Sequence, residues 1–434
     1  MLGLIGFSVF IVALLVFLAT GTPVAVATGL LGVIGVYLFL PPAAIAQLGN
    51  IALSQSANFV LVVVPLFVMM GEALAATTIG RDLFTAAQIW LRRLPGALAV
   101  GTIFACSCFA AVCGSSPVTA ATIGGMAVPE MLRKGYSPSL ALGVTAAGGT
   151  LGILIPPSIP LILYGVITET SIGALFIAGI VPGIMMALLL SATVIYQVWR
   201  DPSIAPRATE AVATRERWTS LRSVIPVMIL AVGVLGSIYT GIATPTEAGA
   251  VGALGALILA VVLGALTRAV MTRILNNTVR TTAMFILLII GGLFSAFVLA
   301  RLGVPQAMAK LLVELNVAPW IILVLINLLL IVLGMFMDPM SLLVIIVPVF
   351  FPAVVALGYD AVWFGVIITI NIEIAAISPP VGFNLFVLKT VIPGAQMRDI
   401  IHGSLIFIIP LALGIGLLIA WPEIALFLPR LMMN

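Results

Sequence analysis

The strongest constraint on this chain is a series of apolar stretches, each long enough to cross a lipid bilayer. About 20 apolar residues span the hydrocarbon core, and such stretches recur from residue 3 to residue 421. Only 7% of the 434 residues are Asp, Glu, Lys or Arg, and the mean hydropathy is +1.34, whereas soluble domains carry about 25% charged residues. The sequence therefore predicts an all-α polytopic protein of the lipid bilayer. It excludes a soluble globule, a disordered chain and a nucleic-acid-binding protein.

Two of the apolar stretches, 97–128 and 320–356, are interrupted near their middles. The interruptions are Gly114-Ser115-Ser116-Pro117 and Met337-Asp338-Pro339. Each half has about 13 to 17 residues, which is short for a crossing, and the halves therefore predict re-entrant helical hairpins. The uninterrupted stretches, which predict full crossings, are 3–20, 24–40, 51–76, 139–168, 172–199, 224–243, 246–266, 280–300, 362–390 and 403–421.

The distribution of basic residues favours the hairpins and orients the chain. Cytoplasmic segments of membrane proteins are enriched in Lys and Arg. With two hairpins and an outside N-terminus, every Lys and Arg falls inside except Arg301, Lys310 and Arg430. A single crossing at either interrupted stretch removes this bias. We therefore expect 201–223, the most polar segment, to be a cytoplasmic linker with a surface helix at about Glu210 to Arg222.

An internal repeat relates the two halves of the chain. The pair Pro156-Pro157 matches Pro379-Pro380 at a shift of 223 residues, and the two hairpin breaks align at a shift of 222. Each half, 1–200 and 224–434, holds five crossings and one hairpin. Because five is odd, the second repeat must be inverted relative to the first. Inverted repeats with discontinuous helices are typical of secondary transporters, although channels built on half-helices share this plan.

The hairpin tips supply the first group of candidate site residues. We expect Ser116 to cap the second helix of the first hairpin, followed by Pro117. A helix that starts inside the membrane presents free N–H groups and the positive end of its dipole to an anion. Ser115, Ser116 and Thr119 are therefore candidate substrate contacts, unless they only satisfy the turn. Asp338 takes the capping position in the second hairpin, either as a plain cap or as a ligand of a cation.

A broken crossing follows each hairpin, at 139–168 and 362–390. A Pro-Pro pair removes backbone donors and frees carbonyl groups, and Gly148, Gly149 and Gly152 permit unwinding and close approach. Unwound carbonyls beside hydroxyl and amide groups suit Na⁺ better than a soft metal, and simple kinking is the alternative. The side chains available in the two breaks are Thr145, Thr150, Ser158, Asn371, Ser378 and Asn384, of which Asn371 and Asn384 are also candidate substrate contacts.

Three glutamates fall in the predicted crossings, and intramembrane carboxylates are functional candidates. Glu373, just before the second break, is the best candidate for a cation ligand. Glu247 starts a helix, where the dipole is a sufficient explanation, and Glu72 lies where it can reach the headgroups. We expect no enzyme, because there is no nucleotide-binding glycine loop and His402 is the only histidine.

Three strings carry a family resemblance that extends over essentially the whole chain. They are CGSSPVTAATIG at 113–124, PEMLRKGYSPSLALGVTAAGGTLGILIPPSIPLILYG at 129–165 and ISPPVGFNL at 377–385. With these strings the sequence resembles the large membrane subunit, called M or DctM-like, of tripartite ATP-independent periplasmic (TRAP) transporters. The resemblance implies an elevator transporter driven by Na⁺, in which a mobile transport domain with both hairpins and both broken helices moves against a scaffold.

The same resemblance implies partners, cargo and site residues. The partners are a small four-helix Q (DctQ-like) subunit and a periplasmic substrate-binding protein that delivers an organic acid such as a dicarboxylate or a sialic acid. The location is a bacterial or archaeal inner membrane, and Na⁺ is the coupling ion with no other cofactor. The alternatives are a stand-alone elevator carrier for divalent anions, an ion antiporter or an ion channel. Carried onto this sequence, the sodium sites fall on Ser115, Ser116, Gly149, Thr150 and Pro156, and on Asp338, Ile377, Ser378 and Pro379.

Overall fold

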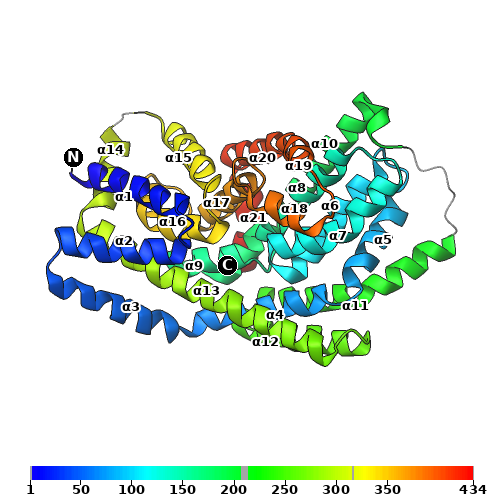
Figure 1. The fold of residues 1–434 in the computed structure, drawn as a ribbon, viewed down its shortest axis with the longest axis horizontal. Coiled ribbons are helices and arrows are strands. Elements are labelled where there is room, and N and C mark those ends of the chain that lie inside the picture. The colour runs from blue at the N-terminus through cyan, green and yellow to red at the C-terminus, as the bar shows by residue number, and fades with distance from the viewer. Residues whose placement is uncertain (1, 207–213, 315–316, 434) are drawn as a thin grey trace.

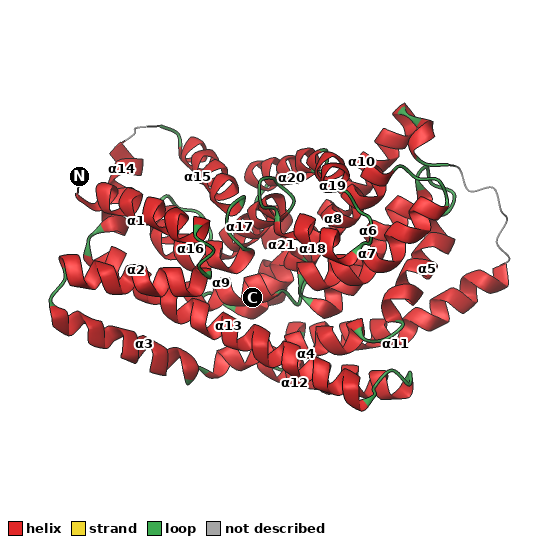
Figure 2. Cartoon of the chain, in the orientation of Figure 1, coloured by secondary structure: helices red, strands yellow, loops and turns green. Residues whose placement is uncertain are grey.

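The computed structural model of the chain describes residues 2–206, 214–314 and 317–433, and every regular element in these ranges is a helix. Figure 2 shows helices joined by short loops throughout. Seven helices are long and apolar enough to cross a membrane, or eight with one bent pair counted as a single span. The prediction of an all-α polytopic membrane protein is confirmed.

Ten α-helices make up the first half of the chain, and they are joined by turns of a few residues. In chain order these are α1 (Leu2–Ala19), α2 (Val24–Phe39), α3 (Ala46–Ser56), α4 (Val63–Ala75), α5 (Ile79–Leu91), α6 (Ala97–Cys113), α7 (Ser116–Arg133), α8 (Pro138–Leu154), α9 (Ile159–Thr168) and α10 (Ile172–Arg200).

The second half adds eleven α-helices, of which α13 is the longest in the described chain. In chain order these are α11 (Thr214–Tyr239), α12 (Pro245–Val262), α13 (Arg268–Arg301), α14 (Val304–Glu314), α15 (Pro319–Gly334), α16 (Pro339–Ala356), α17 (Ala361–Ala376), α18 (Phe383–Val391), α19 (Met397–Leu405), α20 (Ile408–Ala420) and α21 (Glu423–Met433).

Long helices form an elongated layer along one edge of the molecule (Figure 1). In this layer α13 packs against α2, α3 and α4, while α12 packs against α4 and α11. A compact group containing both interrupted stretches lies beside it, with α8 in contact with α6, α7, α17 and α19. The two groups meet where α4 contacts α6 and where α13 contacts α16.

Both interrupted stretches form pairs of packed helices, α6 with α7 and α15 with α16. The first pair turns at Gly114, which has a left-handed backbone with φ of 64°. A Cβ atom added there would lie 2.5 Å from the carbonyl oxygen of Pro157, so only glycine fits the turn. The helical hairpin predicted from the sequence is therefore present at each stretch.

Both predicted broken crossings are interrupted where the Pro-Pro pairs lie. One break separates α8 from α9 and the other separates α17 from α18, and each Pro-Pro bond is cis. The expected unwinding at Gly149 and Gly152 is wrong, because α8 stays helical through both. These glycines instead permit close packing: a Cβ on Gly149 would lie 2.6 Å from Cβ of Ala120, and one on Gly152 would lie 2.9 Å from the carbonyl oxygen of Ser115.

Three other parts of the fold differ from expectation. The stretch 51–76 is not one straight crossing, because the chain bends by 56° between Ser56 and Phe59. The linker predicted at 201–223 is shorter, because α11 begins at Thr214. The surface helix was expected at about Glu210 to Arg222. Its part from Thr214 onward is the start of α11, and 207–213 lie outside the described residues. Helices α5, α14 and α21 were not predicted.

Candidate functional site

A cavity of about 410 Å³ lies between the tips of the two hairpins and the helices α2 and α13. Ser115 and Ser116 line it from the first hairpin, and Asp338 and Ser341 line it from the second. Thr281 of α13 adds a hydroxyl group, while most of the remaining lining is apolar. No Lys, Arg or His belongs to this lining in the part of the chain that the structure describes. The polar groups of the cavity therefore lie chiefly at the hairpin tips.

The tip of the first hairpin leaves a helix start without a side-chain cap. Ser115 occupies the capping position of α7 but makes no capping hydrogen bond. The expectation that Ser116 is the cap is wrong, because Ser116 is the first residue of α7 and its Oγ donates to Oδ1 of Asn384 at 2.9 Å. The first N–H groups of α7 thus keep the positive end of the helix dipole open toward an anion.

The tip of the second hairpin is capped by its own carboxylate. Asp338 Oδ2 accepts hydrogen bonds from the backbone N–H groups of Met340 at 3.1 Å and Ser341 at 3.2 Å, and Ser341 Oγ donates to Oδ1. The prediction that Asp338 caps this helix is confirmed. Asp338 also lines the cavity, so its negative charge lies at the opposite hairpin tip from the uncapped start of α7.

Each hairpin is hydrogen-bonded to the break that follows it. In the first half, the N–H of Ile159 donates to the carbonyl oxygen of Gly114 at 3.3 Å. In the second half, the N–H of Val381 donates to the carbonyl oxygen of Met335 at 3.2 Å. Ile159 and Val381 are 222 residues apart, which is the shift that relates the two hairpin breaks in the sequence.

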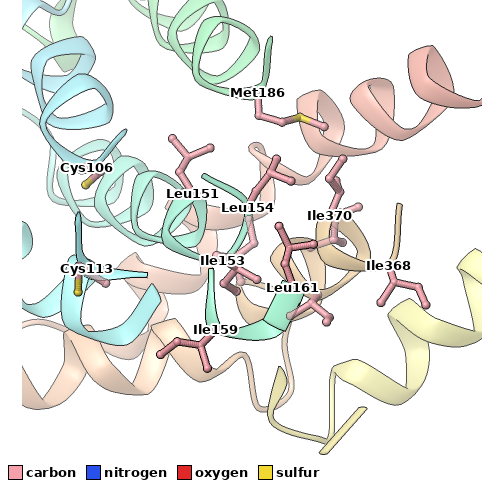
Figure 3. Packing of buried hydrophobic residues seen from close by; sticks show 14 of the residues in the cluster. Cys106, Cys113, Leu151, Ile153, Leu154, Ile159, Leu161, Met186, Ile368 and Ile370 are labelled. Atoms are coloured by element: carbon pink, nitrogen blue, oxygen red, sulfur yellow. The ribbon is translucent and has the colours of Figure 1, made fainter. Parts of the chain in front are cut away.

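The first break brings several predicted residues close together. Figure 3 shows Ile153 and Ile159 on either side of this break, with Cys113 of α6 nearby. Thr150 Oγ1 donates to the carbonyl oxygen of Ala147 at 2.7 Å, one turn before the break. Thr119 is fully buried and its Oγ1 has no hydrogen-bond partner among the described residues.

The second break is held by two serine hydroxyl groups. Ser378 Oγ donates to the carbonyl oxygen of Ile374 at 2.6 Å, and Ser404 Oγ of α19 donates to that of Ile377 at 3.2 Å. Ser378 is fully buried, whereas Pro379 is partly exposed. Pro156 of the first break is buried. Pro156, Ile377 and Pro379 therefore lie in the two breaks, whereas Gly149 and Thr150 lie inside α8.

Among the predicted site residues that the structure describes, Ser115, Ser116 and Asp338 are the ones that line the cavity, and the others lie away from its lining. Asn371 donates to Asn327 Oδ1 and to the carbonyl oxygen of Ile367, which joins α17 to α15. Glu373 is fully buried, and neither carboxylate oxygen has a partner among the described residues. Asn384 is fully buried between α7 and α8.

The remaining glutamates have local explanations. Glu247 is exposed rather than buried and forms a capping box with Thr244, as expected for a residue at a helix start. Glu72 is partly exposed, and its Oε2 accepts a hydrogen bond from Nδ2 of Asn277 at 2.8 Å. This bond ties α4 to α13 within the elongated layer.

Sequence reasoning did not identify Ser341, Thr281 or Asn277. Ser341 follows the Asp338-Pro339 cap by two residues, so the capping motif itself could have indicated it. Thr281 and Asn277 lie on α13, far in sequence from either hairpin. No local pattern connects them with the residues that they face.

Paired helical hairpins, broken helices and a cavity at the hairpin tips are the plan of a secondary transporter, and comparison with known proteins gives the family. Residues 11–424 match the family described as tripartite ATP-independent periplasmic transporter, DctM component. The chain therefore belongs to the DctM family of large TRAP permease subunits, a family of multi-pass transporters and not of enzymes.

Individual relatives agree with this assignment. The chain is 36% identical over 403 residues to the C4-dicarboxylate TRAP transporter large permease protein DctM of Pseudomonas aeruginosa, covering 93% of each chain. It is 35% identical to the sialic acid TRAP transporter large permease protein SiaM of Vibrio cholerae, covering 87% of this chain and 88% of that one. The solved YdaH transporter of Alcanivorax borkumensis has a similar fold, with a TM-score of 0.62, 18% identity and 90% of each chain covered.

Proposed function

We propose that this subunit imports an organic acid together with Na⁺ across a bacterial or archaeal inner membrane. The observation that carries the proposal is the cavity between the two hairpin tips, the breaks beside them and α13. A carboxylate fits at the uncapped start of α7, where free N–H groups and the hydroxyl groups of Ser115 and Ser116 replace a basic side chain. The proposed orientation places the N-terminus in the periplasm.

The donors beside the cavity fit Na⁺ as the co-transported ion. They are backbone carbonyls of two compact breaks, hydroxyl groups and the Asp338 carboxylate, all hard oxygen ligands. No group of three or more His, Cys, Asp and Glu side chains that could hold a metal occurs in the described part of the chain. We assign one Na⁺ to Ser115, Ser116, Gly149, Thr150 and Pro156, and a second to Asp338, Ile377, Ser378 and Pro379, with Glu373 as a further candidate.

An elevator movement fits the two groups of helices. The repeated bond between each hairpin and its break makes the compact group a candidate mobile body, and the elongated layer a candidate scaffold. If residues 1–200 and 224–434 are inverted repeats of each other, the mobile body would have two related conformations. Substrate would cross the membrane when the cavity moves along α13.

The proposed partners follow from the family. A tripartite transporter needs a small membrane subunit, for which we propose a separate four-helix DctQ-like chain, and a periplasmic binding protein that delivers the acid. Among the alternatives, a stand-alone carrier would need neither partner, and a channel would conduct without saturation.

Reconstitution tests the proposed function. The chain is placed in liposomes with its small subunit, and uptake of a radiolabelled acid delivered by the binding protein is measured with Na⁺ or choline outside. We expect saturable uptake that requires both the binding protein and a Na⁺ gradient. Uptake that proceeds equally in choline would disprove Na⁺ coupling, and uptake without binding protein would favour the stand-alone carrier.

Asp338→Asn should weaken the dependence of transport on Na⁺. Asparagine caps helices as well as aspartate does, so α16 should stay intact while the cavity loses a negative charge. We expect the Na⁺ concentration at half-maximal uptake to rise about tenfold, which corresponds to ~1.4 kcal/mol. The control is Asp360→Asn, because Asp360 caps α17 through Val362 and Trp363 but does not line the cavity. An unchanged Na⁺ titration would leave Asp338 a plain cap.

A disulfide between α4 and the first hairpin should stop an elevator movement. A Cβ atom on Gly71 would lie 3.0 Å from Sγ of Cys113, within reach of a disulfide, and 2.9 Å from the carbonyl oxygen of Cys113, so the two helices must shift slightly to accept it. In the Gly71→Cys variant, the introduced cysteine pairs with Cys113. We expect oxidation of this pair to abolish uptake and its reduction to restore uptake. Uptake by the Gly233→Cys variant should not respond to oxidation, because no atom lies within 4 Å of a Cβ added at this position. Unaltered uptake by the cross-linked protein would show that α4 and the hairpin move together.

A further inference from the structure

One buried amide joins elements of the two proposed cation sites. Asn384, the second residue of α18, is fully buried. Its Oδ1 accepts a hydrogen bond from Ser116 Oγ at 2.9 Å, and its Nδ2 donates to the carbonyl oxygen of Ala146 at 3.1 Å. These partners are 268 and 238 residues away in the sequence. Both polar groups of the side chain are therefore hydrogen-bonded to residues of the first half of the chain.

One partner of Asn384 belongs to the first proposed site and the other lies next to it in the sequence. Ser116 begins α7 and lines the cavity. Ala146 lies on α8, about one turn before Gly149 and Thr150. A shift of Asn384 must therefore either move these residues or break the two hydrogen bonds. Breaking them leaves polar groups unsatisfied in a buried place, which is costly.

The backbone of Asn384 is tied just as closely to the second proposed site. Gly382, two residues earlier, has a left-handed φ of 53°. A Cβ atom added to Gly382 would lie 2.8 Å from the carbonyl oxygen of Ser378. The N–H of Val381 in the same turn is bonded to Met335 of the second hairpin. A cation that rearranges the carbonyl groups of this turn will consequently displace Asn384.

We propose that Asn384 is a positioning residue that couples the two cation sites, so that Na⁺ at one site raises the affinity of the other. The inference rests on the proposed function, because it requires both sites to bind Na⁺. It also replaces the expectation that Asn384 contacts substrate, since this residue does not line the cavity and both polar ends are occupied. Coupling between two sites is reciprocal, so Na⁺ binding should be cooperative.

Labelling of a native thiol can measure this cooperativity without knowledge of the acid. Cys106→Ala and Cys108→Ala leave Cys113, which ends α6 at the first hairpin tip, as the remaining thiol. The rate of its reaction with N-ethylmaleimide is followed in the purified transporter as NaCl replaces choline chloride. A coupling factor of 5–150 between two sites gives a Hill coefficient of about 1.4–1.8. We expect this range in the parent protein and about 1 in Asn384→Leu, with the half-saturating Na⁺ concentration raised about 2- to 12-fold, the square root of the coupling factor.

A second lesion and a matched control separate coupling from damage to the fold. Asn384→Ala removes the same two hydrogen bonds without the bulk of leucine and should also lower the Hill coefficient to about 1. Asn327→Leu removes a buried amide whose partner, Asn371, lies in the same half of the chain, and should leave the coefficient unchanged.

The outcomes distinguish this inference from the proposed function. Cooperative titrations in both Asn384→Leu and Asn384→Ala would overturn the coupling role. A parent protein that responds to Na⁺ with a Hill coefficient of 1 would overturn it as well, while Na⁺ binding would stand. A parent protein that does not respond to Na⁺ at all would overturn Na⁺ coupling itself.

Discussion

Replacing Gly403 by alanine should destroy most of the folded protein. Gly403 lies on α19 where that helix crosses α8, and an added Cβ atom would lie 1.8 Å from the carbonyl oxygen of Ser139. A Cβ on Gly143, on the facing side, would likewise lie 2.1 Å from the carbonyl of Gly403. Both obstacles are backbone atoms, so the helices themselves must separate. We expect a destabilisation of about 3 kcal/mol or more, at the upper end for overpacking.

The measurement is the yield and melting temperature of the detergent-purified subunit. Gly416→Ala on α20 is the matched control, because a Cβ there meets no atom within 4 Å. Alanine favours helix over glycine by about 1 kcal/mol, so the control should melt at the same temperature or higher. A Gly403→Ala protein that melts like the control would show that α8 and α19 are not in close contact.

The largest effect on transport itself should come from Ser116→Phe. The phenyl group would enter the cavity at the uncapped start of α7 and break the hydrogen bond to Asn384. Displacement of about 1 Å at a binding site can cost about 100-fold in rate, so we expect Na⁺-driven uptake to fall at least that far. The protein should still insert into the membrane, because the substitution lies at one end of the two hairpin helices.

Insertion and uptake are compared in the same vesicles, with Thr390→Phe as control. Thr390 is exposed on α18, and its hydroxyl donates only to the local carbonyl of Val387. This control should transport at the parental rate. Normal uptake by Ser116→Phe would remove the first hairpin tip from the transport site.

The sequence predicted the positions of the breaks and hairpins well, because proline and glycine act on the adjacent backbone. Gly114 forms its turn through its own left-handed backbone, and Asp338 caps its helix through residues two and three positions later, so both signals are visible in a sequence. The bend between Ser56 and Phe59 was missed because that segment contains neither proline nor glycine to mark it. Helix α5 was missed because it is short and mixed in polarity.

The contacts of the site residues were much harder to predict. Ser116 has the residue type and position of a helix cap, but its hydroxyl is used by Asn384, 268 residues away. Glu72 has a partner 205 residues away in Asn277. Such pairs depend on how the helices pack, and nothing local distinguishes a serine with a distant partner from a serine that caps its own helix.

Helix α13 is longer than the hydrocarbon core of a bilayer is thick. Its 34 residues measure about 51 Å at 1.5 Å per residue, whereas the hydrocarbon core is about 30 Å thick. Its basic residues Arg268, Arg273 and Arg280 fall in the first part, and Arg301 ends the helix. The 21 residues that separate Arg280 from Arg301 cover about 31 Å. Arg280 and Arg301 are therefore about one hydrocarbon thickness apart along the helix axis, and Thr281 of the cavity lining directly follows the first of them.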